Sequence, residues 1–136
     1  MSGGEDFVDT NVVLYLLSAD TAKADRAEEL LATGGTISVQ VLNEFVAVAS
    51  RKLRMPMTGI REVLAQVRAV CVVEPVTIET HELALRIAER YGLSIYDALI
   101  DSAALLADCK TLHSADMQDG QVIERQLTIR NRFVSS

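Results

Sequence analysis

Two patterns of hydrophobic and polar residues alternate along the chain. Short runs of apolar or β-branched residues predict strands; they cover residues 6–9, 36–38, 71–74 and 111–114. In the longer segments between them, apolar residues recur every three or four positions, as they do on one face of a helix. These predicted helices cover residues 21–32, 39–53, 58–70, 77–91 and 94–107.

Residues typical of helix ends accompany the predicted helices. Gly34 and Gly35 follow the first helix and predict its end. Thr58 and Thr77 are the expected N-caps of the third and fourth helices, because a threonine oxygen can accept a hydrogen bond from the first turn. Gly92 predicts the end of the fourth helix, since glycine readily takes the left-handed conformation of a helix terminus.

Short strands that alternate with helices indicate βαβ units, and hence a parallel sheet covered by helices on both faces. The chain has 136 residues, which predicts one domain spanning residues 1–136. Near the end, residues 121–123 and 127–129 are each compatible with a short strand or an irregular segment, and the pattern leaves this open.

The composition fits helices packed on a buried sheet. Hydrophobic residues make up 49% of the chain and aromatic residues only 4%, which favours this architecture over an all-β sandwich. The apolar run 45–49 is too short to cross a bilayer, and residues 1–6 lack the features of a signal peptide. We therefore expect a cytoplasmic protein without a membrane partner. Cys71 and Cys109 are too few for a disulfide framework or a zinc site, and reduced thiols are expected.

The net charge of −6 argues against a large basic surface for nucleic acid. Arg51, Lys52 and Arg54 form the basic cluster that could contact phosphate groups. A solvated helix end explains this cluster at least as well.

Acidic residues follow two of the predicted strands. In open parallel α/β sheets, ligands bind beyond the carboxyl ends of the strands. Asp9 stands at the end of the first strand and is followed by Thr10 and Asn11. Asp116 follows the strand over 111–114, and the hydroxyl residue Ser114 stands two positions before it. Both strand ends therefore present a carboxylate beside a small polar residue.

Two further acids lie within apolar helical segments. Glu44 and Asp97 have few polar neighbours in sequence, and burying an isolated carboxylate is costly unless a cation or strong donors compensate it. A position in the first turn of a helix offers a simpler explanation for Asp97. Asp101 follows Asp97 by four residues, so both carboxylates can share one helix face. Asp101 could join the site or merely flank it.

Several converging carboxylates would repel one another, and a divalent cation is the simplest remedy. Oxygen ligands with room for water suit Mg²⁺ or Mn²⁺, and neither histidine has the spacing of a zinc motif. Sites of this kind activate water and stabilise the charge that develops during phosphodiester cleavage. Acids gathered around a cation would also account for part of the negative charge.

Four segments in order along the chain resemble the PIN domain, and together they span nearly all of it. They are residues 7–12, 38–45, 94–100 and 112–117. Residues 117–120 and 131–133 are similar to the closing elements of the bacterial VapC toxin branch of this family. The resemblance implies a three-layer α/β/α sandwich around a short parallel sheet.

The resemblance also implies a metal site. The family's acidic metal-binding and catalytic set corresponds to Asp9, Glu44, Asp97 and Asp116. Thr10 and Ser114 match hydroxyl positions that orient these acids or a bound water. Asp119 could supplement the site, but a turn before Gly120 explains it better.

The implied activity is Mg²⁺- or Mn²⁺-dependent cleavage of RNA by the toxin half of a toxin–antitoxin pair. A cognate antitoxin would silence it by laying a peptide across the acidic site or an apolar groove, and a homodimer is expected. The alternative is a catalytically inactive PIN-like module that binds RNA or a protein. The complete acidic set favours the nuclease.

Two other acidic α/β classes fit less well. A haloacid-dehalogenase-type phosphatase needs a second aspartate two residues after the first, where this chain has Asn11. A receiver domain needs a phospho-accepting aspartate after a middle strand, and residues 71–75 contain none.

Overall fold

The computed structural model describes residues 6–133, so residues 1–5 and 134–136 of the expected single domain lie outside the described residues. The elements in this part of the chain are β1 (Asp6–Val8), α1 (Thr10–Leu14), η1 (Tyr15–Leu17), α2 (Thr21–Ala32), β2 (Gly35–Ser38), α3 (Val39–Arg51), α4 (Met57–Val70), β3 (Cys71–Glu74), α5 (Ile78–Tyr91), α6 (Ile95–Leu106), β4 (Thr111–His113), β5 (Val122–Ile123) and β6 (Leu127–Arg130).

The strands form one sheet in the order β3-β2-β1-β4-β6-β5. All neighbouring pairs are parallel except β5 and β6, which pair antiparallel at one edge. The expectation of a parallel sheet is therefore correct for five strands and wrong for β5. Both tail segments that the sequence left open are strands.

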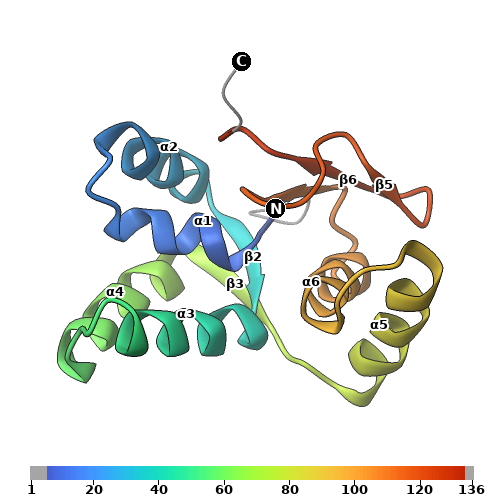
Figure 1. Ribbon diagram of the computed structural model, residues 1–136, viewed down its shortest axis with the longest axis horizontal. Helices are drawn as coiled ribbons and strands as arrows, with labels where there is room; N and C mark the ends of the chain where they lie inside the picture. Colours follow the sequence, from blue (N-terminus) through green and yellow to red (C-terminus); the bar gives the residue numbers. More distant parts are fainter. Residues whose placement is uncertain (1–5, 134–136) are drawn as a thin grey trace.

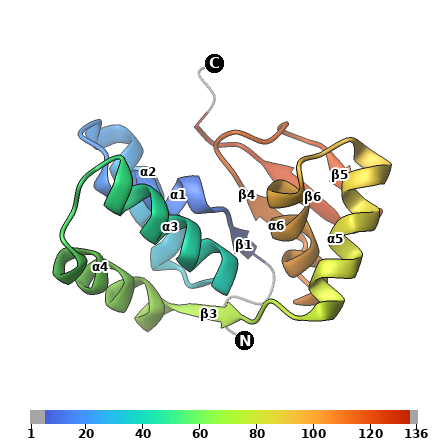
Figure 2. The ribbon, with the colours of Figure 1, turned by 60° about the horizontal axis from the view of Figure 1, so that its bottom comes forward.

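Helices cover both sides of this sheet, which confirms the three-layer sandwich. Helices α1 to α4 lie on one side of the strands and α5 and α6 on the other (Figures 1 and 2). Phe7 of β1 and Leu112 of β4 are partners in the parallel register, and both are fully buried. The core therefore centres on β1 and β4, whose carboxyl ends carry the candidate acids.

The predicted caps of α5 are confirmed. The Thr77 hydroxyl accepts from the Thr80 backbone N–H at 3.2 Å, and the Thr80 hydroxyl accepts from the Thr77 N–H at 3.0 Å. Gly92 ends the helix with φ of 67°, in the left-handed region. This fixed end sets where α6 begins, only a few residues before Asp97.

Two helix boundaries differ from the prediction. Helix α4 begins at Met57, with Pro56 rather than Thr58 at the N-cap and no side-chain hydrogen bond there. Proline tolerates this place because the first N–H groups of a helix lack intrahelical partners in any case. Helix α3 ends at Arg51, two residues earlier than predicted, and Arg54 soon afterwards has φ of 55°.

The sequence did not predict the helical segments α1 and η1. Residues 12–17 are all apolar, so they carry no polar face that would reveal a helical period. In the structure Asp9 is the N-cap of α1. The first candidate acid is therefore held at a helix start.

No helix in the part of the chain that the structure describes is long and apolar enough to span a membrane. The two cysteines are free, as expected: Cys71 is half-buried and Cys109 is buried.

Replacing Arg125 by Gly is expected to stabilise the protein by about 0.5–1 kcal/mol, because relief of left-handed strain outweighs the entropy cost of glycine. Arg125 and its neighbour Glu124 form the turn between β5 and β6, and both have positive φ values, of 60° and 53°. Glycine adopts this region without the steric cost that a side chain incurs. Arg130 is also exposed but lies in the β6 strand, so Arg130→Gly should be destabilising. Urea denaturation of both variants checks this. A change in the free energy of unfolding with the same sign in both would contradict the prediction.

Candidate metal-dependent active site

Four acidic side chains from different parts of the chain line one pocket at the carboxyl ends of β1 and β4. This acidic pocket has a volume of about 280 Å³ and is lined by Asp9, Glu44, Asp97 and Asp116 together with Thr10, Asn11 and apolar neighbours. Asp9 follows β1 and Asp116 follows β4, while α3 and α6 supply the other two acids. The structure thus places the four sequence-predicted acids together, although up to 107 positions separate them, from Asp9 to Asp116.

Asp9 is the most deeply placed acid of the pocket, with 5% of its surface exposed. Its Oδ1 accepts from the Thr10 backbone N–H at 2.7 Å, and its Oδ2 accepts from the Ser114 hydroxyl at 2.9 Å. Burial raises the pKa of Asp9 to about 7 despite these two donors. The Asn11 amide adds a longer hydrogen bond to Oδ2, at 3.5 Å. These hydrogen bonds do not fully compensate the buried charge, and a cation would complete the compensation.

Glu44 is held by two side chains, one on each carboxylate oxygen. The Thr10 hydroxyl donates to Oε1 at 2.6 Å, and the Gln40 amide donates to Oε2 at 2.7 Å. Thr10 has the orienting geometry expected of it. Gln40 was not predicted, although its place four residues before Glu44 on α3 puts both on one helix face.

Asp97 and Asp116 occupy the more open side of the pocket. Burial raises the pKa of Asp97, and the negative charges of Asp116 and then Glu44 raise it further. The Ser114 hydroxyl lies 3.1 Å from Oδ1 of Asp116 and also serves Asp9. One serine hydroxyl therefore connects the acids that follow β1 and β4.

The remaining polar candidates differ in where they lie relative to the acidic pocket; they are Asn11, Asp101 and Asp119. Asn11 lines the pocket, and its Oδ1 accepts from the Ala115 N–H at 3.0 Å, which ties α1 to the loop after β4. Asp101 is fully buried and is not among the residues that line the pocket. Asp119 accepts from the Asn131 N–H at 2.8 Å, which supports its reading as a turn residue.

Asp101 is a buried acid without compensation. Its side chain is fully buried, and neither carboxylate oxygen has a hydrogen-bond partner among the residues that the structure describes. Burial, followed by the charges of Asp9 and Asp97, raises its pKa to about 8. The charges of Asp9 and Asp97 therefore oppose the ionisation of Asp101, and a cation bound in the pocket would favour it.

The donor set fits a hard divalent cation that keeps part of its water shell. In the described range 6–133, no three Asp, Glu, His or Cys side chains are arranged to hold an ion on their own. A full protein cage, as structural zinc requires, is therefore not built here. Mg²⁺ typically takes only one or two carboxylates and fills its octahedron with water, which this open set of oxygens would suit.

No Lys or Arg side chain is among the described residues that line the acidic pocket. The basic cluster Arg51, Lys52 and Arg54 is exposed at the end of α3. Arg51 follows the pocket residues Ala47 and Val48 by about one helical turn, so it stands near the pocket rim.

The family comparison matches most of the chain. A family model described as the PIN domain matches residues 7–118, a range that contains all four acids of the pocket. No curated protein matches the sequence.

Solved structures with a similar fold are distant in sequence. VapBC2 of Rickettsia felis, bound to a promoter DNA fragment, has a TM-score of 0.68 and 20% identity over 93% of this chain and 97% of that chain. VapC20 of Mycobacterium tuberculosis is described as a sarcin–ricin loop cleaving toxin. It has a TM-score of 0.65 and 24% identity over 79% of this chain and 87% of that chain. DNA-bound VapBC from Salmonella typhimurium has a TM-score of 0.65 and 17% identity over 96% of this chain and 98% of that chain. At these identities the similarity establishes the fold.

Proposed function

The chain belongs to the PIN domain family, and from this premise we propose that it is a divalent-metal-dependent endoribonuclease, the toxin of a toxin–antitoxin pair. The observation that carries the proposal is the acidic pocket: four carboxylates converge at the ends of parallel strands without a lining Lys or Arg among the described residues. The fold shared with VapC toxins supports the same assignment. Its RNA substrate would place the activity in the cytoplasm.

In this proposal Asp9, Glu44, Asp97 and Asp116 supply the oxygen ligands for Mg²⁺ or Mn²⁺. The bound ion would lower the pKa of a water and stabilise the charge that develops on the phosphate. Ser114 keeps the Asp9 carboxylate directed into the pocket through its 2.9 Å hydrogen bond. Preset acids of this kind require little rearrangement when the substrate arrives.

A cleavage assay on total cellular RNA tests the proposal directly. Purified protein should degrade RNA with Mg²⁺ or Mn²⁺ and stop when EDTA is added in excess. Mass spectrometry of the preparation should first exclude a co-purified inhibitor. If calorimetry shows that the metal binds but RNA stays intact, the chain is the alternative, a catalytically inactive module that binds RNA or protein.

We further propose that an antitoxin covers an apolar groove between η1, α2 and α4. The groove has a volume of about 380 Å³ and contains Leu17, Leu31 and Val67 among its lining residues. Leu14, a few residues before Leu17, lines the acidic pocket, so a peptide that leaves the groove along this segment would reach the acids. An Arg on that peptide could then occupy the place of the cation's charge.

Replacing Val70 by Asp should weaken antitoxin binding at least about tenfold, because a charge would be buried at the groove. Val70 lines the groove, whereas Val72, which is similarly exposed, does not. Val72→Asp is therefore the matched control, and co-expression with the protein encoded beside the toxin provides the pull-down. Equal losses in the two variants would contradict the proposed groove.

We propose that the protein forms a homodimer through the outer face of α5. Ile78 and Leu85 are exposed by 73% and 50%, and their seven-residue spacing puts them on one face of the helix. Ile78→Glu should produce a monomer in light scattering at micromolar concentration. A wild-type monomer under the same conditions would contradict the dimer.

A further inference from the structure

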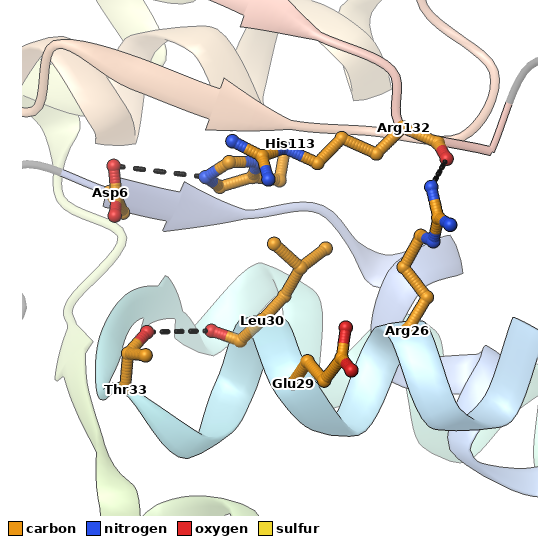
Figure 3. Close-up of a pocket in the computed structure, with 7 residues that line it drawn as sticks. All are labelled: Asp6, Arg26, Glu29, Leu30, Thr33, His113 and Arg132. Carbon is orange, nitrogen blue, oxygen red and sulfur yellow. Dashed lines mark hydrogen bonds and ion pairs between the residues drawn. The ribbon is translucent and has the colours of Figure 1, made fainter.

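A second cavity lies between α2 and the strands, outside the acidic pocket. It has a volume of about 450 Å³. Helix α2 contributes Arg26, Glu29 and Leu30 from one face, and opposite them lie Asp6, His113 and Arg132 (Figure 3). We call this the α2 cavity. Nothing in the proposed cleavage chemistry uses it.

The α2 cavity offers unpaired hydrogen-bond donors. Among the described residues, neither Arg26 nor Arg132 has a carboxylate within 4.0 Å, since the ion pairs found there are Arg90–Glu124 and His113–Asp6. Arg26 donates one hydrogen bond, at 2.6 Å, to the backbone carbonyl of Arg132. This bond holds the two arginine residues side by side and leaves most of their N–H groups available.

The same cavity offers acceptors. The carboxylates of Asp6 and Glu29 line it, and Asp6 lies 3.7 Å from Nε2 of His113. The His113 side chain is only 7% exposed, and its Nδ1 has no hydrogen-bond partner in the described part of the chain. Buried polar atoms are nearly always paired in native proteins, so this nitrogen leaves the hydrogen-bond network beside the cavity incomplete.

The positive and negative side chains of the α2 cavity balance one another, and this determines which ligand fits. Each side of the cavity carries one guanidinium group and one carboxylate, so a bare phosphate would gain little, whereas a neutral planar group with separate donor and acceptor edges would satisfy both kinds of partner. Guanine has this arrangement: O6 and N7 accept from a guanidinium, while N1–H and the N2 amino group donate to a carboxylate. Leu30 offers an apolar surface to the face of the ring.

The α2 cavity extends from Asp6, at the start of β1, to His113, at the end of β4, and at this second end it approaches the acidic pocket. The backbone carbonyl of His113 accepts from the Asp9 N–H at 2.9 Å, and the Ser114 N–H donates to the carbonyl of Arg130 at 3.0 Å. An RNA strand that crosses the ends of β1, β4 and β6 would therefore meet both. Single-stranded RNA is commonly recognised through bases turned out of the stack.

We propose that the α2 cavity binds a guanine base of the RNA substrate and thereby selects where the strand is placed on the acidic pocket. The inference rests on the proposed ribonuclease function. It assigns Arg26 and Glu29 as specificity-determining residues outside the acidic pocket.

Nucleotide binding to the metal-free protein tests the cavity without any cleavage. In EDTA, guanosine 5′-monophosphate should bind at least about tenfold more tightly than the adenosine, cytidine and uridine monophosphates or inorganic phosphate, by calorimetry. Arg26→Lys and Glu29→Gln should each weaken guanosine monophosphate binding about tenfold. Arg61→Lys and Glu28→Gln, exposed residues that do not line the cavity, are the matched controls.

Equal affinity for the four nucleotides, or phosphate binding as tight as that of guanosine monophosphate, would overturn the inference. Cleavage of a short RNA separates this failure from failure of the proposed function. Inosine in place of the recognised guanosine lacks the N2 amino group and should slow wild-type cleavage but affect Glu29→Gln less. Selective nucleotide binding without RNA cleavage would refute the ribonuclease alone. Cleavage indifferent to inosine at every guanosine would refute the guanine site alone.

Discussion

Replacing Asp9 by Asn should lower the rate of metal-dependent RNA cleavage by about 10²–10⁴-fold, a loss of several kcal/mol in transition-state stabilisation. Asp9 is almost fully buried at the end of β1 and directs its carboxylate into the acidic pocket. Asn keeps the shape and can still accept from the Ser114 hydroxyl, but it removes the negative charge that a cation needs. Initial rates at saturating Mg²⁺ provide the measurement.

Asp119→Asn is the control for this experiment. Asp119 lies only three residues beyond Asp116, but its Oδ1 accepts from the backbone of Asn131, and an amide oxygen can do the same. Its cleavage rate should stay within about twofold of the wild type, as for most surface substitutions. Comparable losses in Asp9→Asn and Asp119→Asn would refute the assignment of the acidic pocket as the site of cleavage.

Replacing Asp101 by Asn should stabilise the metal-free protein, increasingly so at higher pH. Burial and nearby acids raise the pKa of Asp101 from 3.8 to about 8 in the folded protein. Between these pH values the folded state keeps a proton that the unfolded chain has released, so the free energy of unfolding falls as pH rises. At about 1.4 kcal/mol per pKa unit, the variant should gain on the order of 4 kcal/mol at pH 7 and almost nothing below pH 4.

Urea denaturation in EDTA at pH 4, 7 and 8.5 measures this gain. Asp25→Asn, on the exposed side of α2, is the control for the loss of an aspartate elsewhere in the chain. Added Mg²⁺ should reduce the difference between Asp101→Asn and the wild type, because a nearby cation favours the ionised acid. A gain of the same size at pH 4 and pH 7 would show that ionisation of Asp101 is not its cause.

The acids of the pocket could be selected from the sequence because they stand at positions where a charged residue is unexpected. Glu44 and Asp97 stand out because they interrupt apolar helices, and Asp9 and Asp116 because they follow strands. Each of these signals is local, and the parallel topology then implies their convergence. The role of Gln40 was not foreseen, since a glutamine on a helix carries no comparable signal until its partner Glu44 is seen at 2.7 Å.

The fold was predictable where periodicity and capping agreed. Helix α5, with its threonine cap and terminal glycine, was placed to within one residue. The segments whose prediction failed lack one of these signals: residues 12–17 of α1 and η1 are all apolar, and α4 begins after a proline rather than at a hydroxyl cap. The direction of β5 depends on the turn at residues 124 and 125, where non-glycine residues adopt positive φ.

The central position of β4 determines when the acidic pocket forms during synthesis. β4 lies between β1 and β6, and Ser114 reaches back across 105 residues to hold Asp9. The N-terminal part of a nascent chain leaves the ribosome first. The acids after β1 and on α3 therefore emerge long before Asp97 and Asp116. Until the β4 segment is released, no complete pocket exists beside the ribosome's own RNA. The proposed activity would therefore begin only after the segment with Ser114 and Asp116 has left the ribosome.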